Sequence, residues 1–165
     1  ASAFLYFIPG SGWRELIHRF KYDGAWRLAR DMGVWYGHCL ADSGLYDTVD
    51  RIVPVPLHWR KRLRRGYNQA EVFAEKLAEE MELPMNARLI RRVKKTKRQK
   101  ELGPAERRKN LEGAFALAKP GQMKYCRILL VDDIYTTGST VDAIASLLKV
   151  NGAEQVDFVC AAIVK

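Results

Sequence analysis

The sequence predicts an α/β domain with a central, mostly parallel sheet flanked by helices. Near the C-terminus, an apolar strand over residues 127–131 is followed by a helix with one apolar face and by a second strand over residues 155–164. A strand, a helix and a strand in this order give parallel pairing. The length of 165 residues suits one domain, and 48% hydrophobic with 28% charged residues is ordinary for a chain that buries a core. We therefore treat residues 1–165 as a single domain.

The N-terminal part, residues 1–50, is predicted to be helical. Apolar residues spaced three or four apart over residues 13–20 predict a first helix, with Gly24 as its stop. A second helix is predicted over residues 26–40.

A short buried strand is predicted over residues 51–55. Pro54 and Pro56 end it in an irregular loop, because neither can donate to a strand ladder. The first basic segment, residues 51–65, holds six basic residues and no acidic one. This segment is therefore predicted to be mostly loop.

The clearest amphipathic helix follows that loop. Asn68 is its predicted N-cap, and Glu71 stands three residues later, as in a capping box. Its apolar face is formed by Ala70, Phe73, Ala74, Leu77, Ala78 and Met81. Residues 89–111 lack a period and are predicted to form a long exposed loop or hairpin, and loops of that length are usually functional.

Positive charge is concentrated in two segments. The chain has 28 Lys and Arg against 19 Asp and Glu, for a net charge of +9. The second basic segment, residues 88–109, holds eleven basic and two acidic residues, and the chain outside the two segments is net acidic. Charge focused in this way indicates a polyanion site, with a solvated basic face as the alternative.

Several protein classes are disfavoured. The longest apolar stretch, residues 158–164, is far shorter than the ~20 residues that span a bilayer, so no membrane insertion is expected. Cys39, Cys126 and Cys160 are odd in number and have no Cys-x-x-Cys spacing, which disfavours a disulfide framework and a structural zinc site. We expect a cytoplasmic protein.

The residues that indicate chemistry stand between a strand end and a helix start. Asp132 and Asp133 are followed by a hydroxyl-rich turn over residues 136–140 with Gly138 in it. Ligands bind at this position in open α/β sheets, and the free N–H groups of a helix start bind anions. Neither a P-loop nor a dinucleotide fingerprint is present.

The adjacent carboxylates can accept hydrogen bonds from a vicinal diol and lie near a hard cation. A ribose 5-phosphate with Mg²⁺ satisfies both halves of the motif. Alone, Asp132 could be a turn cap and residues 136–140 an ordinary polar turn. Their combination at this position favours the phosphate site.

Residues 128–140 resemble the phosphoribosyl pyrophosphate (PRPP) motif of type I phosphoribosyltransferases. The wider pattern resembles the ComF family of late competence and amidophosphoribosyltransferase-like proteins. The residues that carry this wider resemblance are Val53 to Leu57, Arg65 to Ala70, Thr96, Gln99, Leu102, Arg107, Asn110 and Gly113 to Phe115. It covers nearly the whole chain and implies the type I phosphoribosyltransferase fold with a long mobile basic loop.

The resemblance also implies a set of site residues. Asp132 and Asp133 would bind the ribose hydroxyls and act in catalysis, near Mg²⁺ directly or through water, and Tyr135 would stack or pack beside them. Thr136, Thr137, Gly138, Ser139 and Thr140 would bind the 5-phosphate. Leu57, His58, Lys61 and Arg62 would face the pyrophosphate, and the mobile loop over residues 94–110 would contribute Lys97, Gln99 and Arg107.

Two functions are compatible with this resemblance. The first is a Mg²⁺-dependent transferase that moves phosphoribosyl from PRPP to a base or amine in nucleotide metabolism; no acceptor pocket is evident. The second is a competence protein that handles incoming single-stranded DNA, with a helicase partner and with PRPP or a related phosphosugar as ligand. Trp59, beside basic residues, is the tryptophan to test for base stacking. Many ComF relatives carry an N-terminal four-cysteine zinc module, which this chain lacks.

Overall fold

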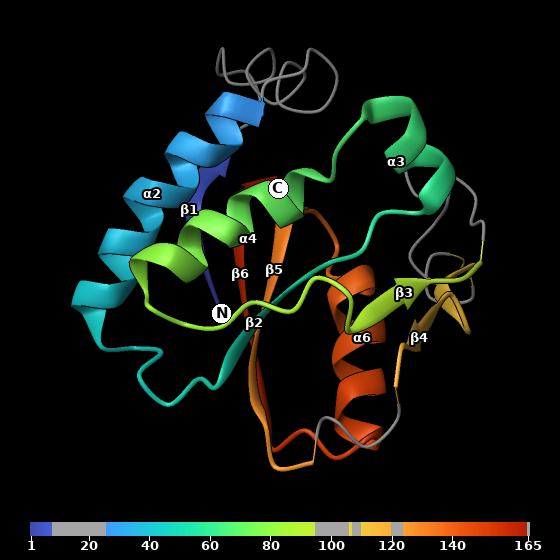
Figure 1. Cartoon of the computed structure of the whole chain (residues 1–165). Helices are drawn as coiled ribbons and strands as arrows, with labels where there is room; N and C mark the ends of the chain where they lie inside the picture. The colour runs from blue at the N-terminus through green and yellow to red at the C-terminus, as the bar shows by residue number, and fades with distance from the viewer. Residues whose placement is uncertain (8–25, 95–105, 107–109, 120–123, 165) are drawn as a thin grey trace.

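The structure, a computed structural model, describes residues 1–7, 26–94, 106, 110–119 and 124–164. Its main sheet has four parallel strands in the order β1-β6-β5-β2. The bounds are Ser2–Phe7 for β1, Arg51–Pro54 for β2, Arg127–Tyr135 for β5 and Gln155–Val164 for β6. The predicted parallel sheet is confirmed (Figure 1).

Helices cover both faces of this sheet. The helices are α2 (Trp26–Ser43), α3 (Trp59–Arg65), α4 (Gln69–Glu80) and α6 (Ser139–Val150). In Figure 1, α2 and α4 lie on one side of the sheet and α6 on the other. Along β5, Leu129 and Val131 pack in the cluster with α2 and α4, whereas Ile128 and Leu130 pack in the cluster with α6. The strand is thus buried on both faces, as parallel strands usually are.

The N-terminal part is not wholly helical. Ser2–Phe7 forms β1, an edge strand that pairs with β6 in parallel. Its aromatic-rich sequence is typical of a strand, and the contact that fixes it comes from the far end of the chain. The prediction over residues 26–40 is confirmed by α2, while the one over residues 13–20 lies outside the described residues.

The first basic segment is also not all loop, because part of it forms α3. His58 caps this helix: its Nδ1 accepts the N–H of Arg60 at 3.3 Å. Gly66 ends it with a left-handed φ of 83° and donates its N–H to the carbonyl of Arg62 at 2.8 Å. A capping side chain followed by a terminal glycine is a helix signal that the charge pattern had obscured.

Helix α4 begins at Asn68 as predicted, but the predicted capping box is wrong. The Asn68 side chain makes no cap and instead donates to the carbonyl oxygen of Val55 at 3.0 Å. Glu71 binds the guanidinium of Arg62 at 3.0 Å. Both side chains therefore fasten the segment between β2 and α4.

The segment over residues 89–111, predicted to be a loop or a hairpin, belongs to a hairpin whose second strand lies beyond the predicted bounds. Strands β3 (Ile90–Arg92) and β4 (Phe115–Leu117) pair antiparallel. The segment is not exposed throughout, because Leu89, Ile90, Leu111 and Phe115 are buried against the α6 side of the sheet. Most of the predicted mobile loop lies outside the described residues.

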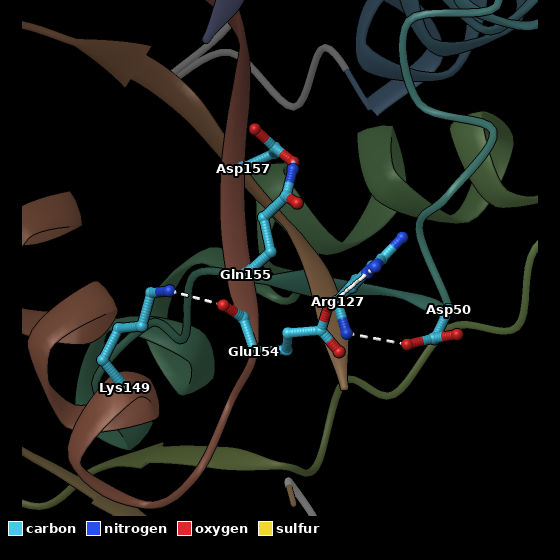
Figure 2. A network of polar contacts seen from close by, with 6 residues as sticks. All are labelled: Asp50, Arg127, Lys149, Glu154, Gln155 and Asp157. Atoms are coloured by element: carbon cyan, nitrogen blue, oxygen red, sulfur yellow. Dashed lines mark hydrogen bonds and ion pairs between the residues drawn. The ribbon is translucent and has the colours of Figure 1, made fainter. Parts of the chain in front are cut away.

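A polar network ties together the amino-terminal edge of the sheet (Figure 2). The Arg127 guanidinium donates to Oε1 of Glu154 at 2.7 and 3.0 Å, and its backbone N–H donates to Asp50 at 2.7 Å. Lys149, at the end of α6, donates to the Glu154 carbonyl at 2.6 Å. These contacts join the starts of β2, β5 and β6, and leave the opposite edge for other groups.

Helices α2 and α4 approach each other very closely at two glycines. A Cβ at Gly33 would lie 2.7 Å from Cβ of Lys76 and 2.8 Å from the Phe73 carbonyl oxygen. At Gly37 it would lie 2.6 Å from Cβ of Glu80. With Ala29 one turn earlier and also buried, these small residues form the contact face of α2.

Replacing Gly33 should therefore destabilise the domain. We expect Gly33→Val to lower the free energy of unfolding in urea by about 2–3 kcal/mol, because the added side chain overpacks the helix contact. As a control, Ala41→Val on the exposed face of α2 should cost no more than about 0.7 kcal/mol. Equal losses in the two variants would contradict the close packing.

Candidate functional site

The carboxyl ends of β2 and β5 lie side by side. The two strands are parallel neighbours, and the N–H of Val55 donates to the carbonyl of Val131 at 2.8 Å. In open parallel sheets this edge is where ligands bind. The segment after β2 and the segment after β5 therefore leave the sheet together.

An open hollow lies where β5 runs into α6. The described residues that line it are Asp132, Ile134, Tyr135, Thr136, Thr137, Gly138, Ser139, Thr140 and Val141. The structure thus brings together the predicted site residues Asp132, Tyr135 and Thr136 to Thr140, but not Asp133. Ile134 and Val141 also line it, and the sequence analysis did not single them out.

The two acidic residues lie inside β5, not after it as the sequence analysis had placed them. Both are half-buried. One oxygen of Asp132 accepts the N–H of Asp133 at 2.8 Å, and one oxygen of Asp133 accepts the N–H of Ile134 at 2.8 Å. Successive strand residues point to opposite faces, which explains why only Asp132 reaches the hollow.

These carboxylates alone do not make a metal cage. Among the described residues, no group of three or more His, Cys, Asp or Glu could hold a metal ion. Mg²⁺, however, commonly takes one or two carboxylates together with water and substrate phosphates. Asp132, the one of the two acids that reaches the hollow, therefore suits Mg²⁺ that arrives with a phosphorylated ligand.

Gly138 shapes the turn below the hollow. Its φ of 74° lies in the left-handed region, and a Cβ there would lie 2.6 Å from the hydroxyl oxygen of Tyr135. The Tyr135 ring packs on Phe158 at 5.6 Å between centroids, so of its two expected roles the structure shows packing. Both the backbone conformation and the close ring require glycine.

The start of α6 offers donors to an anion. The first N–H groups of a helix have no acceptor within the helix, and its dipole favours negative charge there. The hydroxyls of Thr137 and Ser139 lie 3.1 Å apart beside these groups. Backbone and side-chain donors thus converge on the hollow from one turn.

The predicted pyrophosphate residues lie elsewhere at the same edge. Leu57 is half-buried, and His58 is only 7% exposed and serves as the cap of α3. Lys61 and Arg62 are exposed on α3. None of the four lines the hollow, and the predicted loop residues Lys97, Gln99 and Arg107 lie outside the described residues.

Arg92 on β3 is a residue that the sequence analysis did not single out. Burial lowers the pKa of its guanidinium, while the charge of Asp132 opposes that shift. Its Cζ lies 5.5 Å from the centroid of the Phe115 ring, on the paired strand. The hairpin thereby brings a cation toward the acidic pair. In the sequence, Arg92 was one basic residue among eleven, and only the pairing of β3 with β4 distinguishes it.

Cys160 lies opposite Asp132 on β6 and is fully buried. Burial, with a smaller contribution from the charge of Asp132, raises the pKa of its thiol to about 12. The thiol is therefore protonated at neutral pH. This excludes it as a thiolate nucleophile beside the acidic pair.

Residues 68–163 match the family model of the phosphoribosyl transferase domain. This range contains α4, the hairpin, and the hollow with its acidic pair. The chain belongs to the phosphoribosyl transferase domain family.

Curated relatives are more specific. The domain is 35% identical over 145 residues to Competence protein F of Haemophilus influenzae, covering 86% of this chain and 63% of that protein. It is 36% identical over 149 residues to DNA utilization protein YhgH of Escherichia coli, covering 88% of this chain and 64% of that protein. The ComF resemblance is thereby confirmed. The chain spans just under two thirds of the length of these relatives.

Solved structures agree on the fold. Purine phosphoribosyltransferase from Pyrococcus horikoshii matches with a TM-score of 0.50 and 18% identity, covering 82% of this chain and 74% of that one. The allosteric regulatory enzyme of purine biosynthesis matches with a TM-score of 0.51 and 21% identity, covering 80% and 25%. The predicted type I phosphoribosyltransferase fold is confirmed.

No helix among the described residues is long and apolar enough to cross a membrane.

The phosphoribosyl transferase turn should tolerate alanine at Gly138 poorly. We expect Gly138→Ala to cost about 1–3 kcal/mol for the left-handed backbone, and more because the Tyr135 ring must move. Gly113→Ala is the matched control, since its φ is 64° and no atom lies within 4 Å of an added Cβ. Denaturant unfolding gives the loss of stability in each variant. The amount by which the loss in Gly138→Ala exceeds the loss in Gly113→Ala measures the clash with the Tyr135 ring. No excess would show that Tyr135 does not constrain this position.

Proposed function

We propose that this chain binds PRPP or a related phosphosugar with Mg²⁺ in the hollow, as the phosphoribosyl-binding domain of a ComF-type protein in DNA uptake and utilization. The observation that carries the proposal is the meeting of Asp132 with the Gly138 turn and the α6 start in one hollow. Family membership supports the same ligand class.

Each half of the hollow suits one part of the ligand. The 5-phosphate would accept hydrogen bonds from the hydroxyls over residues 136–140 and from the first N–H groups of α6. The ribose hydroxyls would donate to Asp132, which lines the hollow and whose Oδ1 also accepts the backbone N–H of Asp133. Asp133 points to the other face of β5, so its part in ligand binding would be indirect. Mg²⁺, when bound, would supply positive charge against the pyrophosphate. Lys61, Arg62 and the second basic segment would add further cations.

An active transferase that uses a base or amine acceptor is the alternative within this site. Departure of pyrophosphate leaves positive charge at C1 of the sugar, and cations near the leaving group would favour that step. It is tested by measuring pyrophosphate release from PRPP with candidate bases and amines. Release that depends on an acceptor would establish turnover, and its absence would favour a binding role.

The DNA-handling part of the proposal is supported by the names of the relatives and by the charge of the chain. Competence protein F and DNA utilization protein YhgH cover most of this sequence. The two basic segments of the sequence would supply positive charge for phosphate groups. A competence helicase as partner and a cytoplasmic location belong to the same proposal.

Binding of PRPP should depend on Mg²⁺ and on the acidic pair. We expect calorimetric titration to give Mg²⁺-dependent binding that Asp132→Asn weakens about tenfold to a hundredfold, the effect of losing a hydrogen bond to a charged group. Asp133→Asn should have a smaller effect, because Asp133 does not line the hollow.

Asp157→Asn provides the matched control, since Asp157 lies on β6 beside the polar network of Figure 2, at the other edge of the sheet. Its affinity for PRPP should equal that of the wild type. Failure of the wild type to bind PRPP, with and without Mg²⁺, would refute the proposed ligand.

Binding of single-stranded DNA should be strongly salt-dependent. The logarithm of the binding constant should fall against the logarithm of the salt concentration with a slope of about −0.7 for each phosphate contacted. Fluorescence anisotropy with a labelled oligonucleotide measures this slope. A chain that binds no oligonucleotide even at low salt would refute the DNA-handling part of the proposal.

A further inference from the structure

Helix α3 is unusual because none of its residues is buried. Its sequence is Trp-Arg-Lys-Arg-Leu-Arg-Arg, with five basic residues and no acidic one. A surface helix in a globular domain normally buries an apolar face. Here the two apolar side chains point outward, with Trp59 57% exposed and Leu63 75% exposed. Packing against the core therefore does not explain the sequence of α3.

The helix is instead held at its ends. The His58 ring is buried and stacks with the ring of Trp59 at 5.8 Å, with 28° between their planes. At the other end, Arg65 donates to Oε1 of Gln69 at 3.2 Å, and Arg62 pairs with Glu71 on α4. Trp59 is thus exposed to solvent on a fixed backbone. Less conformational entropy is therefore lost when a ligand binds to it.

The outward side chains form two neighbouring rows. Trp59 and Leu63 are four residues apart, as are Arg60 and Arg64, so each pair lies on one face of the helix. The guanidinium carbon of Arg60 lies 5.0 Å from the centroid of the Trp59 indole. Arg64 forms no ion pair with a residue that the structure describes. An aromatic ring, a stacked guanidinium and a further cation therefore stand together on an exposed surface.

This combination matches a polyanion with exposed planar groups. Unpaired bases stack on aromatic rings and on guanidinium planes, while phosphates bind the neighbouring cations. In duplex DNA the base faces are covered by their neighbours and cannot reach an indole. An acidic protein surface would use the cations but would not need the stacked indole and guanidinium.

We infer that α3 is a base-stacking and phosphate-binding surface for single-stranded DNA, formed by Trp59, Arg60, Leu63 and Arg64 and separate from the phosphosugar hollow. This inference rests on the DNA-handling part of the proposed function and not on the phosphosugar ligand. It assigns the contact to residues outside the set predicted to bind PRPP.

The test measures anisotropy of a labelled oligothymidine with the full chain and its variants. Trp59→Ala should weaken binding about tenfold or more, the usual effect of losing a stacked base, and Trp59→Phe should retain most of the affinity. Trp35→Ala is the matched control, because Trp35 is 61% exposed on α2, one turn after the acidic Asp31. It should bind like the wild type.

A second variant tests the phosphate contacts. Arg60→Gln with Arg64→Gln should make the salt slope less steep by about 1.4, that is about 0.7 for each lost contact. Every variant should bind PRPP as the wild type does, which shows that the fold and the hollow are intact.

Three outcomes would overturn the inference. Trp59→Ala could bind oligothymidine like the wild type, or a duplex of equal length could bind as tightly as the single strand and depend equally on Trp59. In either case α3 would be an electrostatic or protein-docking surface. Absence of oligothymidine binding by the wild type would remove the DNA-handling proposal as well, while PRPP binding would still decide the phosphosugar site.

Discussion

Burial of β5 on both faces is the constraint on which the rest of the structure depends. The strand lies between β2 and β6, and its residues 128–131 alternate between the α2–α4 side and the α6 side. Such a strand must be apolar until it leaves the cover of the helices. The change from Val131 to Asp132 marks that point. Polar chemistry can begin only there, so the candidate site lies at the carboxyl end of the strand.

The amino and carboxyl ends of the parallel strands carry different kinds of polar groups. At the amino edge, the guanidinium of Arg127 donates two hydrogen bonds to the carboxylate of Glu154, which joins the starts of β5 and β6. These polar groups bind each other and not a ligand. At the carboxyl edge, the donors of the α6 start and the hydroxyls of residues 136–140 surround an open hollow. The stabilising polar contacts and the candidate site therefore lie at opposite ends of the same strands. A substitution can disturb one edge without directly touching the other.

Much of this arrangement could be predicted from the sequence, because local signals and topology agreed. The strand over residues 155–164 was predicted where the longest uninterrupted apolar stretch lies, and the helix after Asn68 from its strong apolar period. β1 was missed because its partner, β6, is about 150 residues away in the chain. A local sequence pattern cannot indicate pairing between such distant segments. The nearness of Arg92 to Asp132 likewise depends on a hairpin that is closed by distant residues.

Helix α3 was missed in a segment that was predicted to be mostly loop. That prediction rested on Pro54 and Pro56, which end the preceding strand. The helix forms because His58 and Gly66 cap it and because Glu71 and Gln69 hold two of its arginines. Caps and ion pairs supply the stability that apolar packing gives other helices. A helix held in this way keeps its outer face away from the core, so the same contacts that make α3 possible also leave Trp59 and Arg64 exposed to solvent.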